Sequence, residues 1–198
     1  IADDLFNYAH HVVWESGVAE LIEDQQPPTA LGRKPGGIRY TTSAVLVALL
    51  IRVLMKRPPT LTGILQTISE FTPAHLAAVG MPDQDCSRIW RQHSSEYKRF
   101  TSWWQRRLAP FDSWADLPAR RMTNAEYRVR IESRTAEQRE QAERAGRLLH
   151  LAINRLVAAS VEDNNPDNCR GDLVVDGTLY VVAQQDGTIG VADDKMRG

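Results

Sequence analysis

The chain has 198 residues, enough for one large domain or two small ones, and its 42% hydrophobic and 25% charged residues are typical of a globular protein. The net charge of -1 gives no indication of an acidic or a basic partner. The longest apolar run, residues 44–51, is far shorter than the ~20 residues that a membrane span needs. We therefore expect no membrane partner.

The N-terminal sequence and the two cysteines provide indications of the cellular compartment. The chain begins with Ile and shows no signal peptide, which predicts a processed chain or a fragment. Cys86 and Cys169 are far apart and have no metal-ligand spacing, so we expect two reduced thiols. Reduced thiols fit a cytoplasmic protein.

Charge is distributed unevenly along the chain. Residues 1–30 hold six acids and no Lys or Arg. Residues 86–130 hold ten Lys or Arg and four acids, a net charge of +6, whereas residues 161–198 have a net charge of -5. A basic middle between acidic ends favours a local polyanion site, and the alternative is an ordinary solvated helical surface.

The N-terminal part is predicted to be helical and then irregular. Apolar residues in the first 24 positions have a loosely helical spacing. Residues 25–37 contain three Pro and three Gly, which is typical of a linker. We therefore assign residues 1–38 to an N-terminal segment and linker.

Three short helices are predicted next. A threonine or serine at 41–43 caps the first, which two prolines stop. Thr60 caps the second, and Thr72 with Pro73 opens a third that Gly80 ends. Short helices with tight connections are the skeleton of a helix-turn-helix domain, which we place at 39–125.

A fourth helix, predicted from about 87 to 108, is amphipathic. Its apolar face carries Ile89, His93, Tyr97, Phe100, Trp104 and Leu108, and Arg107 falls toward that side. The opposite face, with Lys98 at its edge, is predicted to contact DNA through Arg88, Arg91, Lys98, Arg99 and Arg106. Such a helix fits the major groove, although the same pattern describes any amphipathic surface helix. Trp90, Trp103 and Trp104 are expected to pack in the core.

A long helix is predicted to connect two domains. Residues 109–133 show mixed signals, and Thr135 with Gln138 then forms a capping box for a helix that reaches about residue 161. We place this connecting helix at 126–163. Small and apolar residues recur along it at spacings of three and four. That seam fits docking on a neighbouring domain or a coiled coil, so a homodimer is an option.

Strand signals follow a polar break at 163–171. Residues 172–192 are rich in β-branched side chains and contain a Gln-Asp-Gly turn, which predicts a hairpin. Asp176 lies within its first apolar strand. A buried acid needs compensation, and a divalent cation of a two-metal site supplies it. The alternative is that Asp176 with the following glycine forms a turn.

The order of these features resembles insertion-sequence transposases of the DDE class over residues 38–183. The resemblance rests on a segment like Arg39-Tyr40-Thr41-Thr42 that opens the helical domain, on the segment 87–108, and on the strand Val174-Val175-Asp176-Gly177-Thr178. It implies a mainly α chain: a helix-turn-helix-like domain followed, at 164–198, by the first β-hairpin of an RNase H-like α/β domain.

The resemblance also implies a function. Asp176 would be the first catalytic and metal-binding acid of a transposase that cleaves and transfers strands at the ends of double-stranded transposon DNA with Mg²⁺. The family needs a second Asp and a Glu further along, and Asp193 and Asp194 are too close to the hairpin to serve. We expect no catalysis from these 198 residues alone. The alternatives are a non-catalytic DNA-binding regulator or domesticated transposase remnant, and a helical protein-interaction module.

Overall fold

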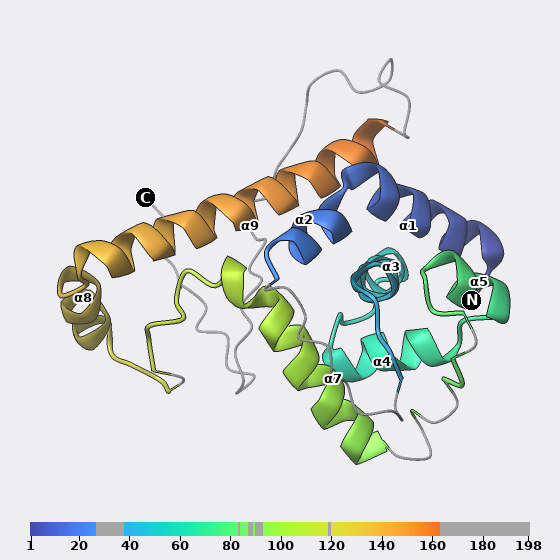
Figure 1. Ribbon diagram of the computed structural model, residues 1–198, viewed down its shortest axis with the longest axis horizontal. Helices are drawn as coiled ribbons and strands as arrows, with labels where there is room; N and C mark the ends of the chain where they lie inside the picture. The colour runs from blue at the N-terminus through green and yellow to red at the C-terminus, as the bar shows by residue number, and fades with distance from the viewer. Residues whose placement is uncertain (27–37, 83, 87–88, 90–92, 119, 163–198) are drawn as a thin grey trace, which may run out of the picture.

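A computed structural model describes residues 1–26, 38–82, 84–86, 89, 93–118 and 120–162. All regular elements in these residues are helices, so the prediction of a mainly helical chain is confirmed for them. They form a helical body from which one arm projects (Figure 1). The predicted hairpin at 172–192 lies outside the described residues.

The first two helices are separated by a single glycine. α1 (Asp3–Ser16) and α2 (Val18–Asp24) meet at Gly17, which has a φ of 57°. That left-handed conformation suits glycine because a Cβ would be strained there. Both helices bury their apolar sides in the core, with Phe6 and Val13 from α1 and Ile22 from α2 among the buried side chains.

The third helix lies at the centre of the body. α3 (Thr42–Leu54) packs against α1 on one side and α4 (Leu61–Ser69) on the other, and Figure 1 shows it end-on between them. The predicted caps are confirmed. Thr41 accepts a hydrogen bond from the backbone of Ala44, and Thr60 accepts one from the backbone of Gly63.

A three-residue connection leads from α4 to α5 (Pro73–Ala78). Thr72 caps α5 as predicted, and its partner in a capping box is His75. Gly80, with a φ of 73°, closes a Schellman turn in which the Met81 amide donates to the Leu76 carbonyl at 2.7 Å. The short helix therefore has a defined end at both termini.

The amphipathic helix α7 (His93–Leu108) packs against α4 and continues into a 3₁₀ turn, η1 (Ala109–Phe111). Of the predicted helix from 87 to 108, the structure describes only this C-terminal part and the single residue Ile89, which is buried.

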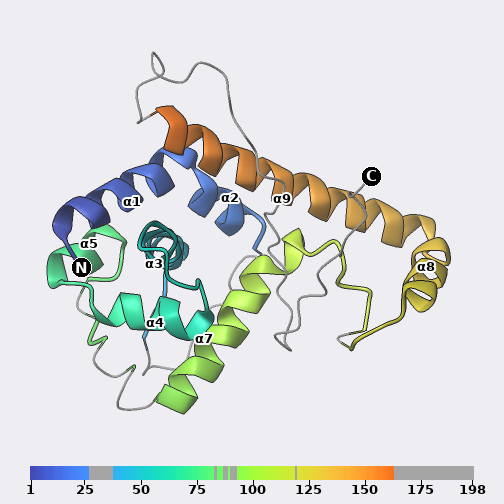
Figure 2. The ribbon, with the colours of Figure 1, turned by 180° about the vertical axis from the view of Figure 1, so that it is seen from behind.

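Two further helices form the arm. α9 (Ala136–Glu162) packs along α1 and α2, while its N-terminal part and α8 (Asn124–Glu132) extend away from the body (Figures 1 and 2). The predicted capping box of Thr135 and Gln138 is confirmed. The small-residue seam is turned inward, since Ala145, Ala152 and Ala159 are buried. The seam therefore docks α9 onto this chain's own body.

Thr41 joins two parts of the body as well as capping α3. Its hydroxyl accepts from the Ala44 amide at 3.1 Å and donates to the Val79 carbonyl at 2.6 Å, whereas Thr60 only caps α4. We expect Thr41→Ala to lower the free energy of unfolding by about 2 kcal/mol and Thr60→Ala by about 1 kcal/mol. Urea unfolding measures both, with Thr41→Ser as the control that keeps the hydroxyl. Equal losses for the two alanine variants would show that the bond to Val79 contributes nothing.

Candidate nucleic-acid interface

The described part of α7 has one buried side and one exposed side, as predicted. Phe100 and Trp104 are buried in the core, and Trp103 packs against it half-buried. The exposed side carries cations, hydroxyls and an amide, contributed by Ser94, Ser95, Lys98, Arg99, Ser102, Gln105 and Arg106. The single acid in α7, Glu96, is only 1% exposed, so this side presents no carboxylate.

The predicted DNA-contacting residues are placed in part. Lys98, Arg99 and Arg106 are exposed on α7. Arg88 and Arg91 lie outside the described residues. The candidate interface can therefore be built only from α7, the C-terminal part of the helix predicted at 87–108.

A buried cluster ties Arg99 to the core. Glu96 accepts a hydrogen bond from Arg99 Nη1 at 2.7 Å through one oxygen and lies 3.5 Å from the Tyr40 hydroxyl through the other. The Arg99 side chain is 48% exposed, so its guanidinium spans the boundary between Glu96 and solvent. A carboxylate buried this deeply needs such a partner because water cannot stabilise its charge.

Burial raises the pKa values of two further groups in this region, Tyr40 and Cys86. Burial, and then the charge of Glu96, raise the pKa of Tyr40 well above its usual range. Burial, and then the charge of Asp85, raise the pKa of Cys86 to about 11. Both groups therefore stay protonated at neutral pH, and the thiol is a poor nucleophile there.

The three exposed cations of α7 thus differ in what they can do. Arg99 forms an ion pair with Glu96. Lys98 and Arg106 have no ion-pair partner among the residues that the structure describes. Lys98 and Arg106 are therefore the free cations of this surface, and Arg99 contributes its charge from a fixed position.

Arg107 faces the body, as its place on the helix predicts. It is half-buried, forms an ion pair with Glu23 of α2 and lies 5.2 Å above the centre of the Trp103 ring. Its carbonyl accepts a hydrogen bond from Gln26 at 3.1 Å. These contacts fasten the C-terminal end of α7 to α2 and remove Arg107 from the exposed surface.

Glu96 and Tyr40 are the residues of this site whose roles the sequence did not predict. The spacing of Glu96 and Arg99 by three residues is a signal for an ion pair on one helix face. The burial of Glu96 comes from tertiary packing, which helical periodicity alone does not reveal.

The predicted metal-binding acid, Asp176, lies outside the described residues. Within the described ranges, no three His, Cys, Asp or Glu side chains are grouped so that they could hold a metal ion. Within the same ranges, no helix combines the length and the apolar character of a membrane span. Comparison with protein-family models, with curated protein sequences and with solved structures found no match to this chain.

The ion pair with Glu96 gives Arg99 a structural role that Arg106 does not share. We expect Arg99→Ala to lower the free energy of unfolding by about 2–3 kcal/mol, because it leaves a buried carboxylate without its partner. In a Glu96→Gln background the same change should cost less than about 1 kcal/mol, since no charge is left behind. Urea unfolding of the parent, the two single variants and the double variant gives the coupling free energy between Glu96 and Arg99.

Arg106→Ala is the matched control, because Arg106 is exposed on the same helix, and it should change stability by no more than about 0.5 kcal/mol. A loss in Arg99→Ala as small as that of the control would mean that Glu96 does not depend on Arg99.

Proposed function

We propose that this protein binds duplex DNA through the exposed side of α7. The observation that carries the proposal is the composition of that side: Lys98, Arg99 and Arg106 stand among hydroxyl and amide side chains, and the only acid of α7 is buried. Cations contact phosphates, while hydroxyls and amides donate to phosphates or to base edges. The side is also free of large apolar groups that a protein partner would cover.

The arrangement of the short helices supports the same proposal. α4 and α5 are joined by three residues and are capped at both starts by threonine, which suits a helix-turn-helix unit. α7 packs on α4 with its apolar side, so its cationic side is left toward solvent. In this proposal α7 enters the groove and the shorter helices hold it in place.

We further propose that the DNA bound is a transposon end and that the complete protein is a DDE transposase. The support is the resemblance of residues 38–183 to that family, above all the strand around Asp176. In this proposal Asp176 holds Mg²⁺ together with a second Asp and a Glu from further along the chain. Metal ions held by carboxylates of this kind would activate the attacking oxygen and stabilise the leaving oxygen during strand cleavage.

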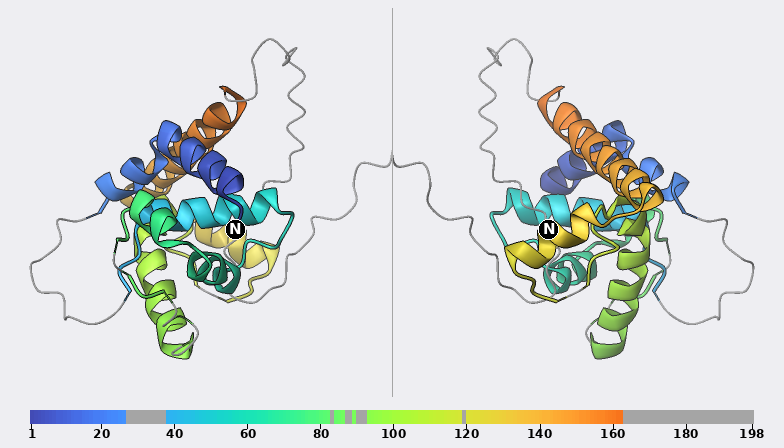
Figure 3. Two further views of the ribbon diagram at one scale, coloured as in Figure 1. Left: turned by 90° about the vertical axis from the view of Figure 1, so that its right-hand side faces the viewer. Right: turned by 90° about the vertical axis from the view of Figure 1, so that its left-hand side faces the viewer.

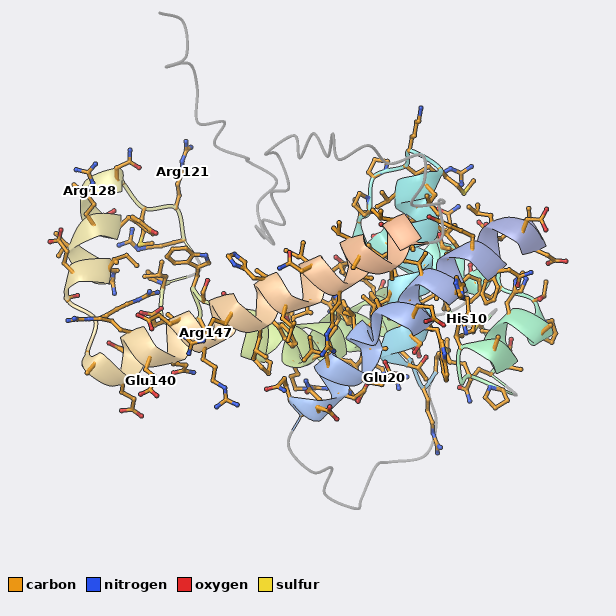
Figure 4. The ribbon with its side chains drawn as sticks, turned by 90° about the horizontal axis from the view of Figure 1, so that it is seen from above. His10, Glu20, Arg121, Arg128, Glu140 and Arg147 are labelled. Carbon is orange, nitrogen blue, oxygen red and sulfur yellow. The ribbon has the colours of Figure 1, made fainter. Side chains whose placement is uncertain are left out.

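The DNA-binding proposal predicts the effect of removing the two free cations. Lys98→Ala/Arg106→Ala should weaken binding to duplex DNA, and the slope of log K against log salt should become less negative by about 2, since each lost phosphate contact contributes about 0.9. Fluorescence anisotropy with a labelled duplex at several salt concentrations measures both. Arg121→Ala/Arg128→Ala removes the same charge from the arm, where both side chains point to one side (Figure 4), and it should bind like the parent. Parental binding by the α7 variant would refute this interface.

The transposase proposal predicts a separation of binding from chemistry. In a protein long enough to include the second Asp and the Glu, Asp176→Asn should abolish Mg²⁺-dependent cleavage of transposon ends. Binding should stay nearly unchanged, because α7 supplies the DNA contacts. Cleavage assays and anisotropy on the same preparation measure the two effects. Cleavage at the parental rate would remove Asp176 from the mechanism.

A further inference from the structure

A second basic region lies outside α7. Residues 25–69 contain six Lys or Arg and no Asp or Glu. Three of these cations, Arg52, Lys56 and Arg57, belong to the end of α3 or to the connection to α4. We call residues 53–60 the α3–α4 corner. Every residue of this corner is exposed, so its cations face solvent without any neighbouring acid in the sequence.

The corner is held from beneath by a buried guanidinium. Arg52 is buried, and it donates from Nε to the Pro58 carbonyl at 2.8 Å and from Nη1 to the Gly63 carbonyl at 3.2 Å. Gly63 permits this approach, since a Cβ at that position would lie 2.2 Å from the Arg52 Cζ. Arg52 has no acidic partner among the residues that the structure describes. Within these residues, carbonyl dipoles and no carboxylate compensate its positive charge under the corner.

Lys56 occupies a backbone conformation that lysine rarely adopts. Its φ is 54°, and it closes the C-terminus of α3 in a Schellman turn, with the Arg57 amide donating to the Arg52 carbonyl at 2.8 Å. Glycine is the usual residue at this place because it has no Cβ. A lysine there costs stability relative to glycine.

The corner and α7 lie at opposite ends of α3. Tyr40, just before α3, packs its ring against Phe100 of α7 with 5.0 Å between ring centres. The corner begins where α3 ends, and a helix of 13 residues is roughly 20 Å long. In both views of Figure 3 the end of α3 lies on one side of the body and α7 on the other. The two cationic surfaces are therefore separate.

We propose that the α3–α4 corner is a second contact to nucleic acid, made to the sugar-phosphate backbone by Lys56 and Arg57 over the buried charge of Arg52. The inference rests on the proposed binding of duplex DNA and adds a second surface to it. Phosphate oxygens accept hydrogen bonds from ammonium and guanidinium groups whatever the base sequence. The exposed side chains of Val53, Leu54 and Met55 beside them are suited to pack against deoxyribose.

The α3–α4 corner has a fixed backbone, which helps its two exposed cations to contribute to binding. Two cations alone bind a polyanion weakly, and they are likewise too few to hold the protein on an anionic membrane. They act at a high effective concentration when the nucleic acid bound through α7 is long enough to pass both ends of α3, which are roughly 20 Å apart. Because Arg52, the Schellman turn and two prolines fix the backbone, little conformational freedom is lost when the contact forms.

The test is Lys56→Gly/Arg57→Ala, assayed on the same labelled duplexes as the α7 variant. The salt slope should become less negative by about 2, and the loss of affinity should be the same for unrelated DNA sequences, as phosphate contacts require. The melting temperature should be unchanged or higher, because glycine suits the φ of position 56. A weaker binder with an intact fold separates a contact from a structural role. Arg121→Ala/Arg128→Ala, with the same charge removed from the arm, should bind like the parent.

Different outcomes overturn different claims. If the corner variant binds as tightly as the parent while Lys98→Ala/Arg106→Ala binds weakly, the corner is no contact and the α7 interface stands. If the parent does not bind duplex DNA at all, both proposals fail. If the corner variant loses binding only to vesicles that contain phosphatidylserine, and not to DNA, the partner of the corner is a lipid surface and the inference is wrong.

Discussion

The burial of most of α3 is the constraint on which the other surfaces depend. Ala44, Val45, Val47, Ala48 and Ile51 are fully buried, and the small side chains among them let neighbouring helices pack closely. α1 and α4 pack against α3, and the exposed side chains of α3 are Val53 and Leu54 at its C-terminal end. The N-terminal end meets α7 through Tyr40, and the C-terminal end forms the α3–α4 corner. Both proposed DNA contacts are therefore positioned by one apolar helix.

Two charged side chains are buried next to these contacts, and each is compensated differently. Glu96 has a charged partner in Arg99, whereas Arg52 has only backbone carbonyls. Burying a charge costs several kcal/mol unless hydrogen bonds replace the lost water, and carbonyl dipoles replace it incompletely. The negative charge of Glu96 is thus neutralised by a guanidinium, whereas no carboxylate among the described residues neutralises the positive charge of Arg52. In the proposed complex, a polyanion near the corner would add to the compensation that the described residues give Arg52.

The sequence predicted the local signals well, because caps and amphipathic spacing act within a few residues. Thr41, Thr60, Thr72 and Thr135 begin helices as expected. The helix α8 was missed in a region of mixed signals, although Thr123 and Glu126 form a capping box that a search for the pattern would have found. The burial of Glu96 and Arg52 was beyond prediction, since it depends on residues 56 and 11 positions away in sequence. The role of Asp176 stays a prediction.

α9 links the DNA-binding proposal to whatever follows residue 162. Its 27 residues span roughly 40 Å, and its C-terminal part lies along α1 with Ala152 and Ala159 buried in the contact. A buried seam of alanines lets two helices approach closely and leaves little freedom to slide, because each methyl group fills a specific gap. The end of α9 is therefore fixed relative to α3, and through α3 relative to both cationic surfaces. In the proposed transposase, the segment that follows α9 would therefore start from a defined point on this body.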